Sequence, residues 1–336
     1  MDEKQLLEIL KTQYGMEDAS VEFLREGGGH TYVVNAKQEN AKQENAKQEN
    51  AKQENAKQEN AKQENARQVT MKQENAEQKY LAKVIGDAFA DTARQSVSVM
   101  RYLEENGFPV PKTILTKDGD AFFEMHGDLF VLMEFIDGDE PDMEKHAAEV
   151  GELVGRFHQL MEKYPRETVT RGKEFFVGRY LEFLRKKGYP RLADYEELGD
   201  RLWEKVGRQS LGICHGDLHR GNLMQSADGK IYLTDFDTIC RAPIMFDLMV
   251  ACDVTNYFNL QPEDVEITKQ VWKEFLAGYS KYHALSTEEI GSFPDWVSIR
   301  HFQLQATILE IYGIDCIDEG FIDSQLSWLR KWKQEV

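Results

Sequence analysis

The feature that most limits how this chain can fold is a polar repeat near its N-terminus. The pentapeptide AKQEN occurs six times without a change from Ala36 to Asn65, and the degenerate copies ARQVT, MKQEN and AEQKY follow. At about 100° per residue, a period of five moves each alanine by about 140° around a helix, so no apolar stripe forms. A polar tract of this kind cannot bury enough apolar surface to order itself. We therefore interpret residues 36–79 as a solvated insertion, with a spacer or partner-binding arm as the alternative.

The segments on either side of the insertion resemble two neighbouring strands of one sheet. TYVV at 31–34 precedes the repeat, and KYLAKVIG at 79–86 follows it. Both segments contain the β-branched and aromatic residues that are typical of strands. Stretching a tight turn between them to about 45 residues costs only about 2 kcal/mol of loop-closure entropy. We therefore predict that the two strands pair despite the insertion.

The rest of the chain predicts a part that is rich in strands, followed by a part that is mostly helical. Two β-rich runs flank Gly27–Gly29 as in a hairpin, and two further strands are expected to turn at Gly127-Asp128. Helical patterns dominate the second half. The expected fold class is α+β and bilobal, with an N-terminal antiparallel-sheet lobe at 1–135 and a mostly helical C-terminal lobe at 136–336.

Composition narrows the classes of partner. The net charge of −18 would be repelled by nucleic acid and by anionic membranes, so neither is expected as a partner. The start, MDEKQLLEIL, does not resemble a signal peptide, and no uncharged apolar stretch approaches the roughly 18 residues of a membrane span. The cysteines lack CxxC spacing and are interpreted as reduced thiols of a cytoplasmic protein.

A polar segment at 214–237 carries the main functional signal. Its sequence, CHGDLHRGNLMQSADGKIYLTDFD, places carboxylates, histidines and an asparagine around Asp228-Gly229. A two-residue Asp-Gly turn would set cross-strand partners whose numbers sum to 457, so that Asn222 lies opposite Asp235. An amide oxygen and a carboxylate at that separation can share a hard cation such as Mg²⁺.

A third polar residue fits the same chemistry. Asp217 lies five residues before Asn222, in the loop that leads into the first strand. From there it can face the metal-bound group without binding the metal, which is the position of a general base for a substrate hydroxyl. A metal, a base and cations over the phosphates are the parts that phosphoryl transfer requires.

These motifs carry a family resemblance. HGDLHRGN followed by LTDFD resembles the aminoglycoside phosphotransferase and choline kinase-like family, a branch of the protein-kinase-like fold. The resemblance covers nearly the whole chain except the repeat. It implies that ATP and Mg²⁺ bind between the lobes and that Asp217 is the catalytic base. It also implies that Asn222 and Asp235 hold the metal, with Asp237 assisting.

The same family resemblance implies that the first lobe contacts the nucleotide. YLAKV resembles the strand with the phosphate-binding lysine, here Lys83, and Gly27–Gly29 resemble the loop over the phosphates. LMEFIDG resembles the hinge, where backbone groups of Glu134 and Ile136 would contact adenine. The family's usual helix glutamate is missing, because the matching segment at 94–97 reads RQSV. This departure puts the positioning of Lys83 in question.

Several nearby residues are expected to have structural roles. The resemblance implies that His215 shapes the catalytic loop and that Asp247, in APIMFDL, braces it. We interpret His219 as a hydrogen-bonded structural histidine rather than a substrate contact. Cys214 is interpreted as a small buried residue rather than a redox switch.

The C-terminal half is aromatic and acidic, which allows two interpretations. Aromatic faces and carboxylates could hold an amine by cation–π attraction. The alternative, which we favour, is an amphipathic helical core with a solvated acidic face.

The sequence therefore predicts an ATP- and Mg²⁺-dependent phosphotransferase that moves the γ-phosphate to a hydroxyl of a small molecule. A cationic acceptor suits the acidic composition, and the candidates are an aminoglycoside, an amino alcohol or a sugar-like compound. Two alternatives stay open: a protein Ser/Thr kinase of the same fold, and a catalytically weak pseudokinase or scaffold. The sequence specifies neither the acceptor nor the oligomeric state.

Overall fold

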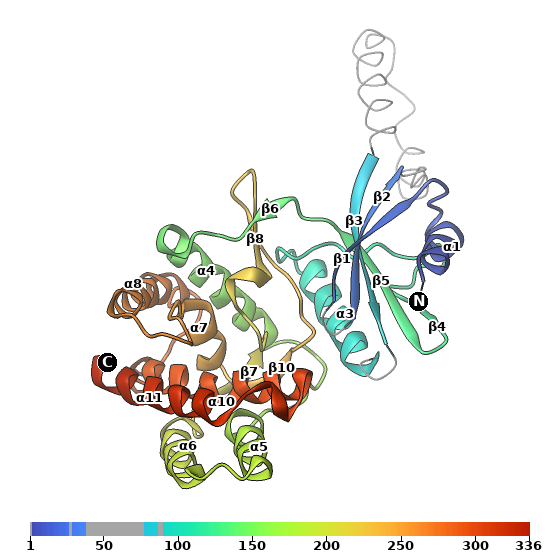
Figure 1. Cartoon of the computed structure of the whole chain (residues 1–336). Coiled ribbons are helices and arrows are strands. Elements are labelled where there is room, and N and C mark those ends of the chain that lie inside the picture. Colours follow the sequence, from blue (N-terminus) through green and yellow to red (C-terminus); the bar gives the residue numbers. More distant parts are fainter. Residues whose placement is uncertain (1, 27–28, 38–76, 87–89) are drawn as a thin grey trace, which may run out of the picture. The chain divides into compact units, whose positions relative to one another are not determined.

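The computed structural model describes residues 2–26, 29–37, 77–86 and 90–336 (Figure 1). Most of the insertion, together with Gly27 and Gly28, lies outside these ranges. The chain divides into two compact units. The first comprises Met1–Glu104 with Pro111–Ile136, and the second comprises Glu105–Val110 with Asp137–Val336.

The first unit is built on a five-stranded antiparallel sheet in the order β1-β2-β3-β5-β4. Its strands are β1 (Ser20–Glu26), β2 (His30–Lys37), β3 (Glu77–Ile85), β4 (Phe123–Met125) and β5 (Asp128–Glu134). The turn between β4 and β5 is one residue earlier than predicted. Met125 pairs with Asp128, and His126 and Gly127 form the turn, both with positive φ. Such a pair of left-handed residues suits the twist of a two-residue hairpin.

The predicted pairing of the strands that flank the insertion is confirmed. β2 and β3 are antiparallel neighbours over eight pairs, from His30 opposite Val84 to Lys37 opposite Glu77. The ladder therefore extends into both ends of the predicted 36–79 insertion, where residues 36–37 and 77–79 belong to strands and are not part of a solvated tract. This part of the sheet is formed by two strands that the repeat separates in sequence.

Two helices accompany the sheet. α1 (Glu3–Tyr14) begins at a capping box formed by Asp2 and Gln5 and ends at Gly15, whose φ of 75° continues the chain without a Cβ clash. The apolar face of α1 packs on one face of the sheet, in a cluster that includes Leu6, Leu10, Val34, Ala82 and Phe130. Figure 1 shows α3 (Ala90–Glu105) on the other side of the sheet from α1.

The second unit is mostly helical, and its short strands form two small sheets. Its α-helices are α4 (Met143–Met161), α5 (Arg179–Lys187), α6 (Leu192–Val206), α7 (Met245–Cys252), α8 (Pro262–Tyr279), α9 (Thr287–Gly291), α10 (Phe293–Tyr312) and α11 (Glu319–Glu335). Its strands are β6 (Gly138–Asp139), β7 (Leu211–Cys214), β8 (Leu223–Ser226), β9 (Ile231–Leu233) and β10 (Cys240–Pro243). β7 pairs with β10, and β8 lies between β6 and β9. The expected α+β class is confirmed.

Aromatic side chains form much of the core of the second unit, as the favoured interpretation of its composition predicted. Phe176 packs edge-to-face on Phe246 and Trp296, and Tyr180 and Tyr195 pack in the same way on Phe302. All six are buried. Offset and edge-to-face ring pairs of this kind add to the stabilisation from buried area. Among the helices that the structure describes, none has the length and apolar character needed to cross a membrane.

Candidate active site

One buried carboxylate binds the backbone of the loop between β7 and β8. Asp247, on α7, accepts hydrogen bonds from the backbone amide of His215 at 2.6 Å and from that of Gly216 at 2.9 Å. Its Oδ2 atom also lies 3.1 Å from Nε2 of His158 on α4. Charge-assisted bonds to a fully buried carboxylate are strong, because water does not compete for them. The expected bracing role of Asp247 is confirmed.

Gly216 is required by the shape of this loop. Its φ is +86°, and a Cβ atom on it would lie 2.1 Å from the carbonyl oxygen of Thr238. The hydroxyl of Thr238 in turn donates to the carbonyl of His215 at 3.0 Å. The ring of His215 is buried, and its Nε2 lies 2.8 Å from the carbonyl oxygen of Thr234. These contacts agree with the expectation that His215 shapes the loop.

Asp217 follows directly and keeps about a third of its side chain exposed, at 35%. Its Oδ1 atom accepts a hydrogen bond from Nη2 of Arg300 at 3.1 Å, and its Oδ2 atom lies 3.6 Å from Nε2 of His219. Nδ1 of His219 accepts from the amide of Gly221 at 3.0 Å, so the proton of a neutral ring is on Nε2, toward Asp217. His219 is thus hydrogen-bonded, as expected.

Asn222 is tied to the same loop. Its side-chain Nδ2 donates to the backbone carbonyl of Asp217 at 2.8 Å, and its own amide donates to the carbonyl of His219 at 2.9 Å. Within the part of the chain that the structure describes, Oδ1 of Asn222 accepts no hydrogen bond. The structure therefore brings Asp217 and Asn222 together, with an amide oxygen left for another ligand.

The predicted register of the hairpin is wrong by one residue. Cross-strand numbers sum to 456 and not 457, because Leu223 pairs with Leu233 and Met224 pairs with Tyr232. The amide of Thr234 donates to the carbonyl of Asn222 at 3.0 Å, so Thr234 and not Asp235 lies opposite Asn222.

The cause of this shift is the turn, which has three residues and not two. Ser226 and Lys230 close it by a backbone hydrogen bond of 3.0 Å. Oδ1 of Asp228 accepts from the hydroxyl of Ser226 at 2.5 Å, and Gly229 has a φ of +84°. A residue in the left-handed region at the third position is typical of three-residue hairpin loops.

Asp235 and Asp237 flank a buried aromatic residue. Phe236 is fully buried and packs 5.0 Å from the ring of His215 and 6.1 Å from that of Phe157. Both aspartates are partly buried, and Asp235 has a φ of 62°, a left-handed conformation that aspartate tolerates better than most residues. The pairing of Asn222 with Thr234 places Asp235 one residue from the position opposite Asn222.

The candidate nucleotide contacts of the first unit lie on its sheet. Lys83 is 8% exposed on β3, between Thr31 and Val131 on the neighbouring strands. It lies on the face opposite the cluster with α1, because neighbouring residues of a strand point to opposite faces and Ala82 belongs to that cluster. A Cβ on Gly29 would lie 2.4 Å from the carbonyl oxygen of Val84, so β2 begins in close contact with β3.

The expected hinge residues lie at the end of β5 and just after it. Glu134 pairs with Tyr80, and its backbone amide donates to the carbonyl of Lys112 at 2.8 Å. Ile136 is half-buried at the end of the first unit. The amide of Glu134 is therefore already engaged within its own unit.

The helix that the family resemblance expects to carry a glutamate shows a different pairing. Ser96 is buried on α3, and Arg94 forms a 2.7 Å ion pair with Glu124 of β4. At the other end of α3, Glu104 contacts Arg101 and the amide of Thr113. The acidic residues with described side chains on this helix thus lie about two turns or more beyond Ser96.

One site residue was missed by the sequence analysis. Arg300, on α10, is 9% exposed and contacts Asp217, while its Nη1 donates to Oε1 of Gln303 at 2.5 Å. Its guanidinium lies 5.7 Å from the ring of Phe246. A signal was present, because Arg300 is the sole Asp, Glu, Lys or Arg between positions 296 and 309. A lone charge in an apolar helix is rarely buried without a partner.

The charge of this arginine also acts on the carboxylate of Asp253, a half-buried residue. Asp253 accepts from the amide and hydroxyl of Thr255 at 3.0 and 2.7 Å, and from the hydroxyl of Tyr257 at 3.1 Å. Burial raises the pKa of Asp253 above its ordinary value, and the Thr255 hydrogen bonds and the charge of Arg300 oppose that rise. Arg300 therefore lies among polar groups that the core of the second unit fixes in place.

Comparisons with known proteins agree with this geometry. The family model of the phosphotransferase enzyme family (APH) matches residues 58–285. A homoserine kinase from Methylobacillus flagellatus is 23% identical over 227 residues, which cover 66% of this chain and 69% of that protein. The chain therefore belongs to the phosphotransferase enzyme family, and the expected enzyme class, a kinase-like phosphotransferase, is confirmed.

Solved structures support the fold. Amicoumacin kinase hAmiN aligns with a TM-score of 0.70 at 17% identity, covering 100% of this chain and 94% of that one. A microcompartment-associated aminopropanol kinase aligns with a TM-score of 0.67 at 16% identity, covering 98% of this chain and 95% of that one. At such identities the likeness concerns the fold, and it confirms the expected protein-kinase-like architecture.

Proposed function

We propose that this phosphotransferase moves the γ-phosphate of ATP, in the presence of Mg²⁺, to a hydroxyl of a small molecule that also carries an amine. The observation that carries the proposal is the hydrogen bond from Asn222 to the carbonyl of Asp217, in a loop that Asp247 holds rigid. This hydrogen bond joins a candidate base and a candidate metal ligand within one loop.

The donor set fits a hard divalent cation. Oδ1 of Asn222 and the carboxylates of Asp235 and Asp237 are all oxygen ligands, which Mg²⁺ prefers. When bound, the ion would neutralise charge on the transferred phosphate. The nearby thiol of Cys214 is a poor ligand by contrast, because burial raises its pKa well above the ordinary value and keeps it protonated.

Asp217 is suited to accept the proton of the acceptor hydroxyl. Arg300 occupies Oδ1, which fixes the rotamer of the carboxylate and leaves Oδ2 as the proton acceptor. In the first unit, Lys83 is the proposed phosphate contact, together with Gly27, Gly28 and Gly29 in the sequence between β1 and β2. Ile136 and the carbonyl group of Glu134 are the proposed adenine contacts.

The acceptor class follows from chemistry that relatives share. The curated relative is named a homoserine kinase and a solved neighbour an aminopropanol kinase, and both named substrates carry an amine and a hydroxyl. The net charge of −18 favours a cationic acceptor over an anionic one.

A coupled ATPase screen over amino alcohols, aminoglycosides, homoserine and neutral sugars tests the proposal. We expect turnover with an amine-bearing alcohol and a fall in kcat on the order of 10²- to 10⁴-fold in Asp217→Asn. Asp118→Asn, in an exposed turn of the first unit, is the matched control and should keep full activity. Unchanged turnover in Asp217→Asn would remove the proposed base. Phosphate incorporation into protein without turnover of any alcohol would favour the protein-kinase alternative.

A further inference from the structure

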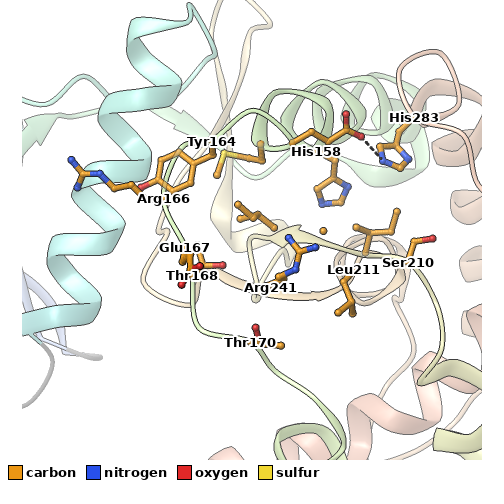
Figure 2. Close-up of a pocket in the computed structure, with 15 residues that line it drawn as sticks. His158, Tyr164, Arg166, Glu167, Thr168, Thr170, Ser210, Leu211, Arg241 and His283 are labelled. Carbon is orange, nitrogen blue, oxygen red and sulfur yellow. Dashed lines mark ion pairs between the residues drawn. The ribbon is translucent and has the colours of Figure 1, made fainter.

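The second unit contains a cavity that the proposed active-site residues do not line. Its volume is about 560 Å³, and it lies between the end of α4, the segment that follows α4, and strands β7 and β10 (Figure 2). A cavity of this size accommodates a small metabolite. Asp217, Asn222, Asp235 and Asp237 are all absent from its lining.

A single arginine dominates the charge inside this cavity. Figure 2 shows the side chain of Arg241, on β10, directed into the cavity toward His158. Arg241 is exposed, and within the described ranges its guanidinium forms no hydrogen bond or ion pair. The backbone of Arg241 is fixed on both sides, because its amide donates to Val169 and its carbonyl accepts from Arg171, both at 2.8 Å. These bonds fix the backbone alone, and the exposed guanidinium that it carries is suited to bidentate binding of a carboxylate or a phosphate.

The two carboxylates of the lining contact partners other than this arginine. Glu162 pairs with His283 at 3.3 Å, as the dashed line in Figure 2 marks. Glu167 also has a partner of its own. Arg166 points away from the cavity in Figure 2. The positive charge that remains directed inward is that of Arg241.

A hydroxyl beside β10 offers a second contact. Thr168 lines the cavity, and its Oγ1 atom is buried without a hydrogen-bond partner in the described structure. A buried hydroxyl that lacks a partner is costly unless a ligand or water satisfies it. An oxyanion bound to Arg241 would supply an acceptor for such a donor.

The wall of the cavity is connected to the catalytic loop. His158 lines the cavity, and its ring nitrogens contact Tyr279 at 2.9 Å and Asp247 at 3.1 Å. Asp247 in turn holds the amides of His215 and Gly216, directly before Asp217. In addition, β10 pairs with β7, the strand that leads into that loop. A ligand that displaced His158 would therefore act on the catalytic loop through the side chain of Asp247.

We propose that this cavity is an effector site for a small organic anion, a carboxylate or a phosphate ester, which binds Arg241. Occupancy then alters the phosphotransferase rate through His158 and Asp247. The binding part stands independently, whereas the effect on rate rests on the proposed function.

Thermal unfolding of the full chain with citrate, glucose 6-phosphate or inorganic phosphate tests binding, with sodium chloride at equal ionic strength as reference. We expect at least one organic anion to raise Tm by about 2 °C at ten times its Kd. Arg241→Gln should weaken this binding at least tenfold, and Thr168→Val should weaken it less. Arg208→Gln, another exposed arginine of the same unit, should leave it unchanged.

Two outcomes would overturn the proposal: no anion exceeds the chloride reference, or the shift persists in Arg241→Gln, which would place the anion elsewhere. Inorganic phosphate acting alone would likewise contradict an organic ligand. If the chain proves inactive toward every alcohol, the Tm measurements still decide the binding site. The anion that binds is then added to the phosphotransferase assay, where an unchanged rate at saturation would remove the effector role.

Discussion

The guanidinium of Arg300 lies 3.1 Å from the carboxylate of Asp217, although the two residues are 83 positions apart in the chain. This contact joins α10 to the loop that follows β7, and the arginine is nearly fully buried. Burial strengthens the electrostatic part of the contact and restricts both side chains to one arrangement. Arg300 is therefore a positioning residue for the proposed base.

The pair predicts a specific pattern of substitutions. Arg300→Lys keeps the positive charge but loses the planar fork, so we expect kcat to fall about 10- to 100-fold with the fold retained. The double variant Asp217→Asn/Arg300→Lys should be no slower than Asp217→Asn, because the arginine acts through that carboxylate. Arg330→Lys, an exposed arginine paired with Asp194, is the control. Additive losses in the double variant would show that Arg300 acts independently of Asp217. Steady-state kinetics measure both effects.

Gly216 and Gly119 form a matched pair of left-handed glycines. A Cβ at Gly119, whose φ is +90°, meets nothing within 4 Å, whereas one at Gly216 meets the Thr238 carbonyl at 2.1 Å. Gly119→Ala should therefore cost about 1 to 2 kcal/mol of stability with unchanged activity. Gly216→Ala should cost more and also lower kcat, because the loop must move. Urea unfolding and kinetics together check this, and equal effects of the two substitutions would contradict it.

Stability should depend on pH through His301. Burial lowers the pKa of His301 from 6.5 to about 3, while a hydrogen bond to Gln325 opposes the shift. The unfolded chain takes up a proton near pH 6.5 and the native chain does not, so the free energy of unfolding falls as pH decreases from 6.5 toward 3. Between pH 6.5 and 5 this loss amounts to about 2 kcal/mol. His301→Gln should flatten the dependence by that amount in urea titrations. An identical slope in the variant would exclude His301 as the source.

Removal of the repeat tests whether β2 and β3 pair without it. The β2–β3 ladder extends to Lys37 opposite Glu77, so a short Asn-Gly turn can join these residues directly. Replacing residues 38–76 by such a turn should preserve the fold and raise stability by about 2 kcal/mol through loop closure. Circular dichroism and thermal unfolding of the shortened chain measure both. A shortened chain that fails to fold would show that the repeat contributes to the core.

Much of this protein could be predicted from local pattern. The flanking strands TYVV and KYLAKVIG predicted a paired sheet, since strand propensity and alternation are local properties. The motif from His215 to Asp237 predicted the chemistry, because side-chain type and spacing limit what such a loop can bind. Its register failed by one residue, since the bond from Ser226 to Asp228 favours a three-residue turn that the Asp-Gly dipeptide alone does not reveal.

Tertiary structure decided what surrounds that motif. Arg300 reaches Asp217 from α10, and His158 reaches Asp247 from α4, because helices far apart in sequence pack into one core. Neither contact leaves a spacing signature, as burial and partner choice depend on the packing of the whole unit. The sequence by itself predicted which groups are candidates for acting on phosphate. Only the packing of the helices decided which of those groups have a buried partner, and that Arg300 and His158 are these partners.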